Sequence, residues 1–434
     1  MPRRPPKKSA APTAEEVVID ALGPQGDGIH KSAGGPIYVE RALPGDTVIA
    51  QVQRSGGALR GELTQIITPS PDRIEAPCPS YNVCGGCTLQ HANADLYRGW
   101  KIEIVRTALG KVGLEPKTWL EPTYLEAGTR RRVTFAAFKS GKAVTLGYFR
   151  RRSHQVAEIN ACLVAEPGIM DLRQRLGPLL VPLLQGGKPA DVFIQSVNGL
   201  YDVVITGAVG ATGVPDFKIY DAATTLVQTA KVSRISWRAS ENDDAEVLLE
   251  ASPIHAVFGA LRVPLPPLAF LQPTALGERA LVEAVMSALP ATGKFADLFA
   301  GCGTFSGPML ERGTVDAFEN SAPAIQALNK ARAAKPLNPI RRDLFRNPLL
   351  ADEFKKYDAV VFDPPRAGAA EQVKTLALSK VARVVGVSCN PNTFARDARV
   401  LVDGGYALDS VKVVDQFTWS HHVELVAVFT KAKK

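Results

Sequence analysis

The stretch GKFADLFAGCGTFSGPML, residues 293–310, decides the fold of the carboxyl-terminal part of the chain. It reads as an apolar strand, a glycine-rich turn and the start of a helix, with glycines at 301, 303 and 307. This spacing departs from the G-x-G-x-x-G of dinucleotide-binding proteins, but such a turn still brings the backbone close to a ligand. From about residue 266 onwards, apolar strands alternate with helical segments, which predicts a doubly wound, Rossmann-like α/β sheet.

Polar side chains follow the successive strands of this predicted sheet. Glu319 ends TVDAFE, where a carboxylate can accept hydrogen bonds from both hydroxyls of a ribose. Asp343, in NPIRRDLF, lies where an adenine amine is expected, and Asp363 follows the next strand, in YDAVVFDPPRAG. Cys389 ends the strand after it, in RVVGVSCNPNT. Open α/β sheets bind ligands at this edge, so these side chains predict a cofactor site there.

The order of strands and polar strand ends resembles that of class I S-adenosylmethionine (SAM) methyltransferases. The closing sequence YALDSVKVVDQFTWSHHVELVAVF is similar to the carboxyl-terminal hairpin of that fold. The resemblance implies that the cofactor is SAM.

A cysteine at the exit of such a strand fits one methylation chemistry in particular. C5 of uracil has no lone pair, and a thiolate that adds to C6 turns the ring into an enolate whose C5 attacks a methyl sulfonium. A base must then remove the C5 proton so that elimination returns the enzyme. Cys389 is therefore a candidate nucleophile, the alternative being an inert, partly buried thiol.

The 434 residues carry a formal net charge of +8, which favours a polyanionic partner. Two segments, TRRRVTF at 129–135 and GYFRRRSHQ at 147–155, each contain three consecutive arginines beside aromatic or β-branched residues. On strands, alternate arginines would face one side, and two such segments predict a basic, aromatic-bearing surface for nucleic acid. The candidate RNA-binding residues are Arg130, Arg131, Arg132, Arg150, Arg151 and Arg152.

The amino-terminal half divides at proline-rich junctions. Residues 13–70 show short β-rich runs between Gly and Pro turns, which predict a five-stranded, oligonucleotide-binding (OB) type barrel. ALPGDTVIAQV and GPQGDGIHK resemble the TRAM domain of RNA-modifying proteins. Helices are expected at 95–109 and near 169–184. The predicted domains are a basic disordered tail (1–12), a TRAM-like barrel (13–72), a mixed α/β, RNA-binding central domain with an iron–sulfur site (73–265) and a methyltransferase domain (266–434).

No stretch approaches the roughly 18 apolar residues that span a bilayer, and the basic, Pro-rich amino terminus lacks the apolar region of a secretory signal. We therefore expect a cytoplasmic protein that has no membrane partner, and we expect it to be a monomer.

Four of the six cysteines form a candidate metal site. Three occur in CPSYNVCGGCTLQH, a C-x5-C-x2-C run, and a fourth stands alone 75 residues after the last of these. Each iron of a [4Fe–4S] cluster needs one thiolate, which this set supplies. Zinc held by four cysteines is the alternative; zinc sites usually pair two short hairpins, so the spacing slightly favours iron–sulfur. The candidate ligands are Cys78, Cys84, Cys87 and Cys162.

Taken together, CGGCTLQH, DLFAGCGTFSG, FDPPRAG and SCNP resemble the uracil-C5 RNA methyltransferase family, over nearly the whole chain from about residue 13. The branch most similar is the bacterial one that acts on 23S ribosomal RNA and carries a TRAM domain and a [4Fe–4S] cluster. The resemblance implies that Cys389 is the nucleophile and Glu424 the base, and that the four cysteines bind the cluster. It implies cofactor contacts by Gln272, Phe299, Thr304, Glu319, Asp343 and Asp363. The chain departs from the family at Thr304 and Thr274, where asparagine is usual.

Three other functions remain open at this point. A tRNA uracil-C5 methyltransferase would use the same chemistry. An amino-group DNA methyltransferase would explain DPPR but would need no cysteine and usually has an aromatic residue after the prolines. A non-catalytic RNA-binding protein would retain the fold without methyl transfer.

Overall fold

The computed structural model describes residues 11–207 and 217–431, so most of the predicted basic tail lies outside the described residues. The chain forms two compact units. The first comprises Met1–Ile104 with Trp419–His421, and the second comprises Val105–Thr418 with His422–Lys434. Every helix within the described ranges is too short or too polar to cross a lipid bilayer.

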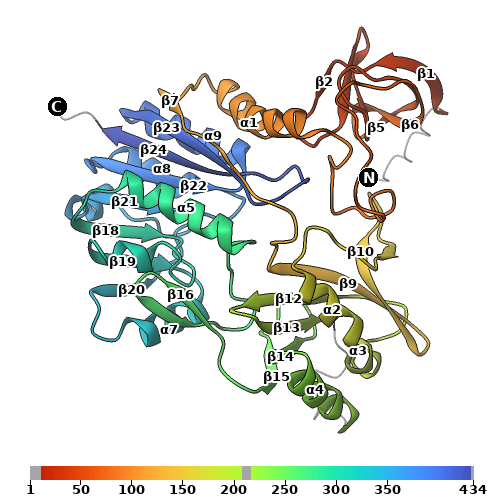
Figure 1. Cartoon of the computed structure of the whole chain (residues 1–434). Helices are drawn as coiled ribbons and strands as arrows, with labels where there is room; N and C mark the ends of the chain where they lie inside the picture. Colours follow the sequence, from red (N-terminus) through yellow and green to blue (C-terminus); the bar gives the residue numbers. More distant parts are fainter. Residues whose placement is uncertain (1–10, 208–216, 432–434) are drawn as a thin grey trace, which may run out of the picture. The chain divides into compact units, whose positions relative to one another are not determined.

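The first unit contains a six-stranded sheet in the order β1-β5-β6-β4-β3-β2, shown in red in Figure 1. The sequence predicts five strands, and the sixth is the two-residue β2, which pairs with β3. The sheet encloses one apolar core built around Val17, Val39 and Val48. Its strands are β1 (Thr13–Val18), β2 (Ala21–Leu22), β3 (Gly28–Ser32), β4 (Gly35–Val39), β5 (Thr47–Ser55) and β6 (Ala58–Thr68). Helix α1 (Ala94–Gly110) confirms the helix expected at 95–109.

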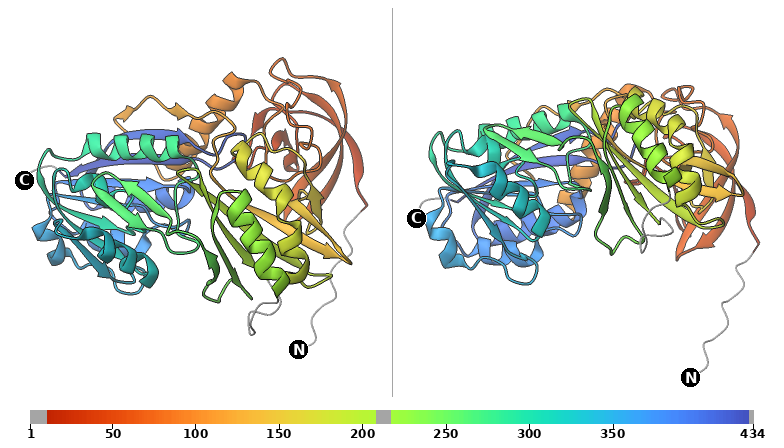
Figure 2. Two further views of the ribbon diagram at one scale, coloured as in Figure 1. Left: turned by 60° about the horizontal axis from the view of Figure 1, so that its bottom comes forward. Right: turned by 90° about the horizontal axis from the view of Figure 1, so that it is seen from below.

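The second unit begins with a seven-stranded sheet in the order β11-β10-β9-β12-β13-β14-β15. Helices α3 and α4 pack against each other and on this sheet (Figure 2). The single helix expected near 169–184 is two helices, α2 ending at Arg175 and α3 beginning at Gly177, because Pro178 has no N–H to continue the hydrogen bonds of the first helix. The elements are β9 (Arg132–Ser140), β10 (Ala143–Phe149), β11 (Val156–Glu158), α2 (Pro167–Arg175), α3 (Gly177–Leu183), β12 (Pro189–Val197), β13 (Leu200–Thr206), α4 (Phe217–Thr229), β14 (Val232–Arg238) and β15 (Glu246–Glu250).

A nine-stranded sheet forms the rest of the second unit, with a main path in the order β20-β19-β18-β21-β22-β24-β23-β7. Strands β18 to β22 are parallel, and β24 is antiparallel to both of its neighbours. The predicted doubly wound sheet with a closing hairpin is confirmed (Figure 1). The strands are β18 (Gly293–Leu298), β19 (Gly313–Glu319), β20 (Leu337–Arg341), β21 (Ala359–Phe362), β22 (Arg383–Ser388), β23 (Tyr406–Asp415) and β24 (Glu424–Lys431).

Helices and a hairpin complete this region. Buried apolar side chains from the sheet, the helices and the hairpin together form its core. The hairpin of β16 (His255–Phe258) and β17 (Leu261–Pro264) packs next to α6 and α7. The helices are α5 (Ala275–Ala288), α6 (Ser306–Met309), α7 (Ala322–Arg332), η1 (Ala351–Lys356), α8 (Ala370–Ala377) and α9 (Pro391–Asp403).

Two short strands from the predicted central domain join this sheet. Both β7 (Thr118–Trp119) and β8 (Thr123–Tyr124) pair in parallel with β23. Strands of two residues carry too little periodicity for sequence patterns to reveal them. The domain boundaries stay a prediction.

Candidate active site

The register of the large sheet brings the predicted polar strand ends to one edge. Leu298 of β18 lies level with Phe318 and with Phe362, the residues just before Glu319 and Asp363. In the antiparallel pair, Ser388 lies opposite Leu425. Cys389, which follows β22, and Glu424, which begins β24, therefore lie at the same edge although 35 residues separate them.

A cavity of about 330 Å³ opens at this edge. Among the residues that line it are four of the predicted cofactor contacts: Phe299, Thr304, Glu319 and Asp363. The other two predicted contacts, Gln272 and Asp343, are not among them. Residues that line it without having been predicted include Phe270, Cys302, Arg342 and Phe345.

The glycine-rich turn forms one wall of the cavity, and each of its glycines is needed. Gly301 and Gly303 have φ angles of 54° and 95°, in the region that side chains disfavour. A Cβ at Gly307 would lie 1.9 Å from the carbonyl oxygen of Phe258. The end of β16 could therefore not lie this close to the turn if residue 307 carried a side chain. Burial raises the pKa of Cys302, in the same turn, to about 12, consistent with a packed, unreactive thiol.

Glu319 is fixed where it meets this turn. One carboxylate oxygen accepts a hydrogen bond from the Gly301 amide at 3.0 Å, and the other accepts one from the Ser321 amide at 2.8 Å. The carboxylate is thus held in place by backbone donors beside the cavity. Aromatic rings of Phe299 and Phe345, with centroids 5.5 Å apart, give the cavity an apolar side.

Asp297 lies beneath the turn and was not predicted. It is fully buried in β18 and accepts a hydrogen bond of 2.5 Å from the Ser306 hydroxyl. Burial, with smaller contributions from Asp363 and Glu319, raises its pKa to about 7. The sequence does contain a signal for Asp297, namely an acidic residue inside the apolar run FADLF. Charged residues are rarely buried without a partner, so a carboxyl at this position indicates a special role.

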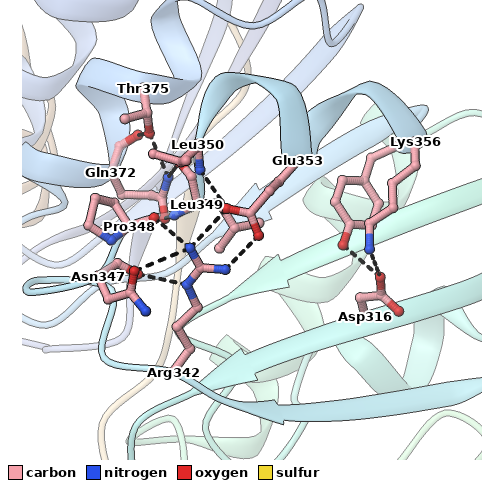
Figure 3. Close-up of polar contacts among 11 residues, drawn as sticks. Asp316, Arg342, Asn347, Pro348, Leu349, Leu350, Glu353, Lys356, Gln372 and Thr375 are labelled. Carbon is pink, nitrogen blue, oxygen red and sulfur yellow. Dashed lines mark hydrogen bonds and ion pairs between the residues drawn. The ribbon is translucent and has the colours of Figure 1, made fainter.

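Arg342 organises the loop after β20, which carries Asp343 and Phe345. Its guanidinium donates to both carboxylate oxygens of Glu353, at 2.6 and 2.9 Å, and to the Asn347 backbone carbonyl at 2.7 Å (Figure 3). Asp343 accepts hydrogen bonds from the amides of Phe345 and Arg346. Asp343 therefore stabilises the turn that presents Phe345 to the cavity.

Cys389 is half-buried beside the loop that follows β21. The carbonyl oxygen of Arg366 accepts hydrogen bonds from the Asn390 amide group at 3.0 Å and the Thr393 hydroxyl at 3.1 Å, which ties the two loops together. Burial, and then the carboxyls of Glu424 and Asp363, raise the pKa of the Cys389 thiol to about 11. The Arg366 side chain opposes this shift through its charge and a hydrogen bond. Among the described residues that shift this pKa, Arg366 is therefore the one that favours the thiolate form of Cys389 over the thiol.

Glu424 is buried, and one of its oxygens, Oε2, has no hydrogen-bond partner among the described residues. Burial and the neighbouring Asp363 raise its pKa well above the usual range for glutamate. Burial also raises the pKa of Asp363, to about 7. Three acids, one thiol and two carboxyls, thus share this end of the site, and the negative charge of one disfavours ionisation of the others.

Gln272 lies at the back of the site rather than in the cavity wall. It is buried, and its Nε2 donates to Asp363 at 3.4 Å. Its Oε1 accepts a hydrogen bond of 2.7 Å from Gln416, a residue that was not predicted.

The first arginine segment lies at the start of β9. Arg131 forms an ion pair of 2.6 Å with Glu278 of α5, so its charge is engaged inside the fold. The Arg132 guanidinium lies 4.2 Å from the ring centroid of Phe270, and burial lowers its pKa to about 10. Arg130 lies 5.8 Å from the ring centroid of Phe417.

The three arginines of the second segment lie just beyond the end of β10, contrary to our expectation that they lie on a strand. The Arg150 amide still donates across the hairpin to the Gln155 carbonyl at 2.8 Å, and Arg151 and Arg152 form the turn, where Arg152 has a φ of 48°. The hairpin pairing of Phe149 with Val156 leaves these residues beyond the ladder. RNA contact by the six arginines stays a prediction.

The four predicted metal ligands are free cysteines and half-buried. Cys78, Cys84 and Cys87 belong to the first unit and Cys162 to the second. Thiolates suit iron, but within the part of the chain that the structure describes, no three His, Cys, Asp or Glu side chains are grouped to hold a metal ion. The predicted cluster site is therefore not shown, and we derive no chemical step from a cluster.

Comparison with known proteins decides the family. A family model described as tRNA (Uracil-5-)-methyltransferase matches residues 323–432. An uncharacterized RNA methyltransferase of Caulobacter vibrioides is 43% identical over 433 residues, covering 96% of this chain and 100% of the relative. The chain belongs to this family of RNA methyltransferases. The family model and the relatives, taken together, make it a SAM-dependent RNA uracil-C5 methyltransferase.

Other relatives of this methyltransferase extend the comparison. A 23S rRNA (uracil(1939)-C(5))-methyltransferase, RlmD, of Vibrio parahaemolyticus is 29% identical and covers 99% of each chain. The crystal structure of Pyrococcus abyssi tRNA (uracil-54, C5)-methyltransferase with S-adenosyl-L-homocysteine has a TM-score of 0.76 at 24% identity, covering 96% of this chain and 99% of the other. The second likeness shows that the two proteins share the fold.

Proposed function

We propose that this methyltransferase forms 5-methyluridine in RNA, with Cys389 as nucleophile and Glu424 as base. The observation that supports this most directly is their placement at one sheet edge, beside the cavity and next to Asp363. An RNA-binding protein without chemistry has no need of a thiol and a buried carboxyl brought together in this way. An amino-group methyltransferase does not need the thiol either.

The reaction follows from the needs of the uracil ring. The Cys389 thiolate adds to C6, and the electrons of the C5–C6 double bond move onto O4 as an enolate. The enolate electrons return through C5 and would form a bond to the methyl carbon of SAM, while the bond between that carbon and the sulfonium sulfur breaks and S-adenosylhomocysteine leaves. Glu424 then removes the C5 proton, the double bond reforms, and the C6–S bond breaks to release the thiolate.

The cavity fits the second reactant. SAM would supply an electrophilic methyl group there. The paired rings of Phe299 and Phe345 offer a surface for adenine, and the fixed Glu319 carboxylate can accept hydrogen bonds from ribose hydroxyls. Carboxyls at Asp297 and Asp363 lend the site negative charge when ionised, which suits the cationic reactant.

We propose 23S ribosomal RNA as the substrate. The Vibrio relative that carries this activity in its name spans nearly the whole of both chains, whereas the tRNA enzyme from Pyrococcus supports only the fold. The amino-terminal sheet, as a TRAM-like module, and the arginine segments would hold phosphates and unstacked bases while the target uracil is turned out of its stack. A tRNA substrate is the alternative.

A deletion strain tests this proposal. Mapping 5-methyluridine in ribosomal and transfer RNA from wild-type and deletion cells should show one or more 23S positions lost, and the gene should restore them. Loss confined to tRNA would assign the alternative substrate. An unchanged map of both RNAs would reject uracil methylation.

We also propose a [4Fe–4S] cluster on Cys78, Cys84, Cys87 and Cys162, on the strength of the cysteine pattern alone. Protein purified without oxygen should be brown and contain about four iron and four sulfide per chain. The Cys87→Ala variant should lose both. One equivalent of zinc instead would replace this proposal with the zinc site.

A further inference from the structure

The second unit contains another cavity, of about 360 Å³, in the region of the seven-stranded sheet. Its lining residues come from β10, from β11 and the residues after it, and from α2 and α3. We call it the β10 cavity. Val144 and Leu146 of β10 and Leu180 of α3 give it apolar walls. Its volume lies within the range of about 300 to 1,000 Å³ that is usual for small-ligand sites, and no residue that we assign to the reaction lines it.

Arg173 of α2 is the buried cation of the β10 cavity. It is 8% exposed, and its Nε and Nη2 both donate to the carbonyl oxygen of Leu146. Its third nitrogen, Nη1, has no hydrogen-bond partner among the described residues and is not sealed from solvent. Because Arg173 lines the β10 cavity, the two N–H bonds of Nη1 are available to a ligand there.

A carboxylate and two amides complete the polar lining. They belong to Glu158, Asn160 and Gln174, whose side chains are exposed and therefore accessible to a ligand. Burial lowers the pKa of the Arg173 guanidinium, and the negative charge of Glu158 opposes this shift. The cavity thus brings a hydrogen-bond donor of positive charge close to an acceptor of negative charge.

This pair of opposite charges disfavours a simple ion as the ligand. A phosphate would meet the Glu158 carboxylate, and a cation would meet the Arg173 guanidinium. A carboxylate only accepts hydrogen bonds and a guanidinium only donates them, so the pair fits a neutral group that offers N–H groups beside an oxygen. Unstacked nucleobases have this form. Guanine fits best, because its N1–H and N2–H groups can bond both oxygens of one carboxylate while its O6 accepts from an arginine.

We propose that the β10 cavity binds an unstacked guanine base of the RNA substrate, with Glu158 accepting from N1–H and N2–H and Nη1 of Arg173 donating to O6. The apolar side chains of β10 and α3 would cover the faces of the base. This inference rests on the proposed function, because it takes RNA as the substrate.

The second arginine segment lies on the hairpin that lines the β10 cavity. Arg150 follows β10, four residues after Leu146, which is a separation of about 13 Å along an extended strand. Arginines bind RNA phosphates without regard to sequence. One short RNA segment can therefore place its phosphates at the tip of the hairpin and a base in the cavity.

Short labelled RNAs test the inference with the full-length protein. Fluorescence anisotropy should show that the pentanucleotide UUGUU binds about 10- to 100-fold more tightly than UUAUU, the usual value of a good pair of contacts to a base. The analogue with inosine in place of guanosine lacks only the N2 amino group and should lose much of this advantage. Equal affinity for the three RNAs would overturn the inference.

The Glu158→Gln variant tests whether the β10 cavity is the place of binding. Glutamine has the same size but offers one acceptor where guanine needs two, so the preference for UUGUU should disappear. Glu246→Gln, at an exposed position of β15 in the same sheet, makes the same change of charge and should keep the preference. A preference that persists in Glu158→Gln would overturn the inference. Replacing Arg173 is less informative, because its bonds to Leu146 join α2 to β10.

GMP distinguishes RNA from a free nucleotide as the source of the guanine. UUGUU should bind more tightly than GMP, and Arg150→Gln should weaken the binding of UUGUU and UUAUU equally, because a phosphate contact does not depend on the base. GMP that binds as tightly as UUGUU would assign the β10 cavity to a free nucleotide and overturn the inference.

The outcomes separate this inference from the proposed function. At saturating RNA, Glu158→Gln should form the covalent adduct with 5-fluorouracil RNA at the wild-type rate, because Glu158 does not line the cofactor cavity. A wild-type protein that prefers UUGUU but forms no such adduct would overturn uracil methylation alone. Adduct formation without any preference for guanine would overturn this inference alone.

Discussion

Replacing Cys389 with alanine is expected to abolish uracil methylation, lowering the rate on the order of 10⁴-fold or more. The reason is electronic. Without a thiolate on C6 the ring remains electron-poor, and C5 has no electron pair to offer a methyl group. The variant should still bind S-adenosylhomocysteine, because Cys389 is not among the residues that line the cavity.

RNA that contains 5-fluorouracil at the target position provides the measurement. Fluorine cannot leave as a cation, so wild-type enzyme and SAM should accumulate an adduct that survives denaturation, and Cys389→Ala should form none. Equal behaviour of the two proteins would disprove the thiol addition, provided that binding of S-adenosylhomocysteine shows both to be folded.

The second large effect is expected from Glu424→Gln, which should stop the reaction after methyl transfer. Glutamine cannot accept the C5 proton, so the methylated ring stays bonded to Cys389 and its release slows by about 10² to 10⁴-fold. Ordinary uracil RNA should then yield a labelled, denaturation-resistant complex. Glu371→Gln is a matched control, because Glu371 is exposed on α8 and pairs only with Lys374 among the described residues.

The pH dependence of stability should change in the same variant. Burial and Asp363 raise the pKa of Glu424 in the folded protein, so the folded state binds more protons than the unfolded state above pH 4.3, roughly the ordinary value for glutamate. The free energy of unfolding of the wild type should therefore fall as pH rises towards the raised pKa. Urea titrations should show a smaller fall in Glu424→Gln; an equal fall would mean that Glu424 is not the buried acid responsible.

Residues near strand ends could be predicted because the sheet obeys a general rule. Parallel strands present their carboxyl ends at one edge, so the sequence alone predicts that Glu319, Asp363 and Cys389 gather there. The glycine-rich turn was equally readable, since its backbone angles admit few other residues.

Contacts between side chains that are far apart in the chain have no comparable sequence pattern. Gln416 is one polar residue after a strand, and nothing local shows that its amide meets Gln272, which lies 144 positions earlier. Arg131 is a predicted RNA contact, and nothing local in the sequence shows that it forms an ion pair with Glu278, 147 positions later. The second arginine segment was expected on a strand and lies in a turn, because the register of β10 with β11 ends at Phe149.

The amino-acid sequence by itself determined the doubly wound sheet and the amino-terminal β-rich module, and it supplied the groups that we propose to react. These depend on periodicity, on turn residues and on motifs, all of which are local. Tertiary structure alone decided which oxygen of Glu424 has no partner among the described residues, which arginine is engaged and which acids disfavour one another's ionisation. Such properties depend on burial and on partners distant in the chain, because the free energy of a charge is set by its surroundings and not by its neighbours in sequence.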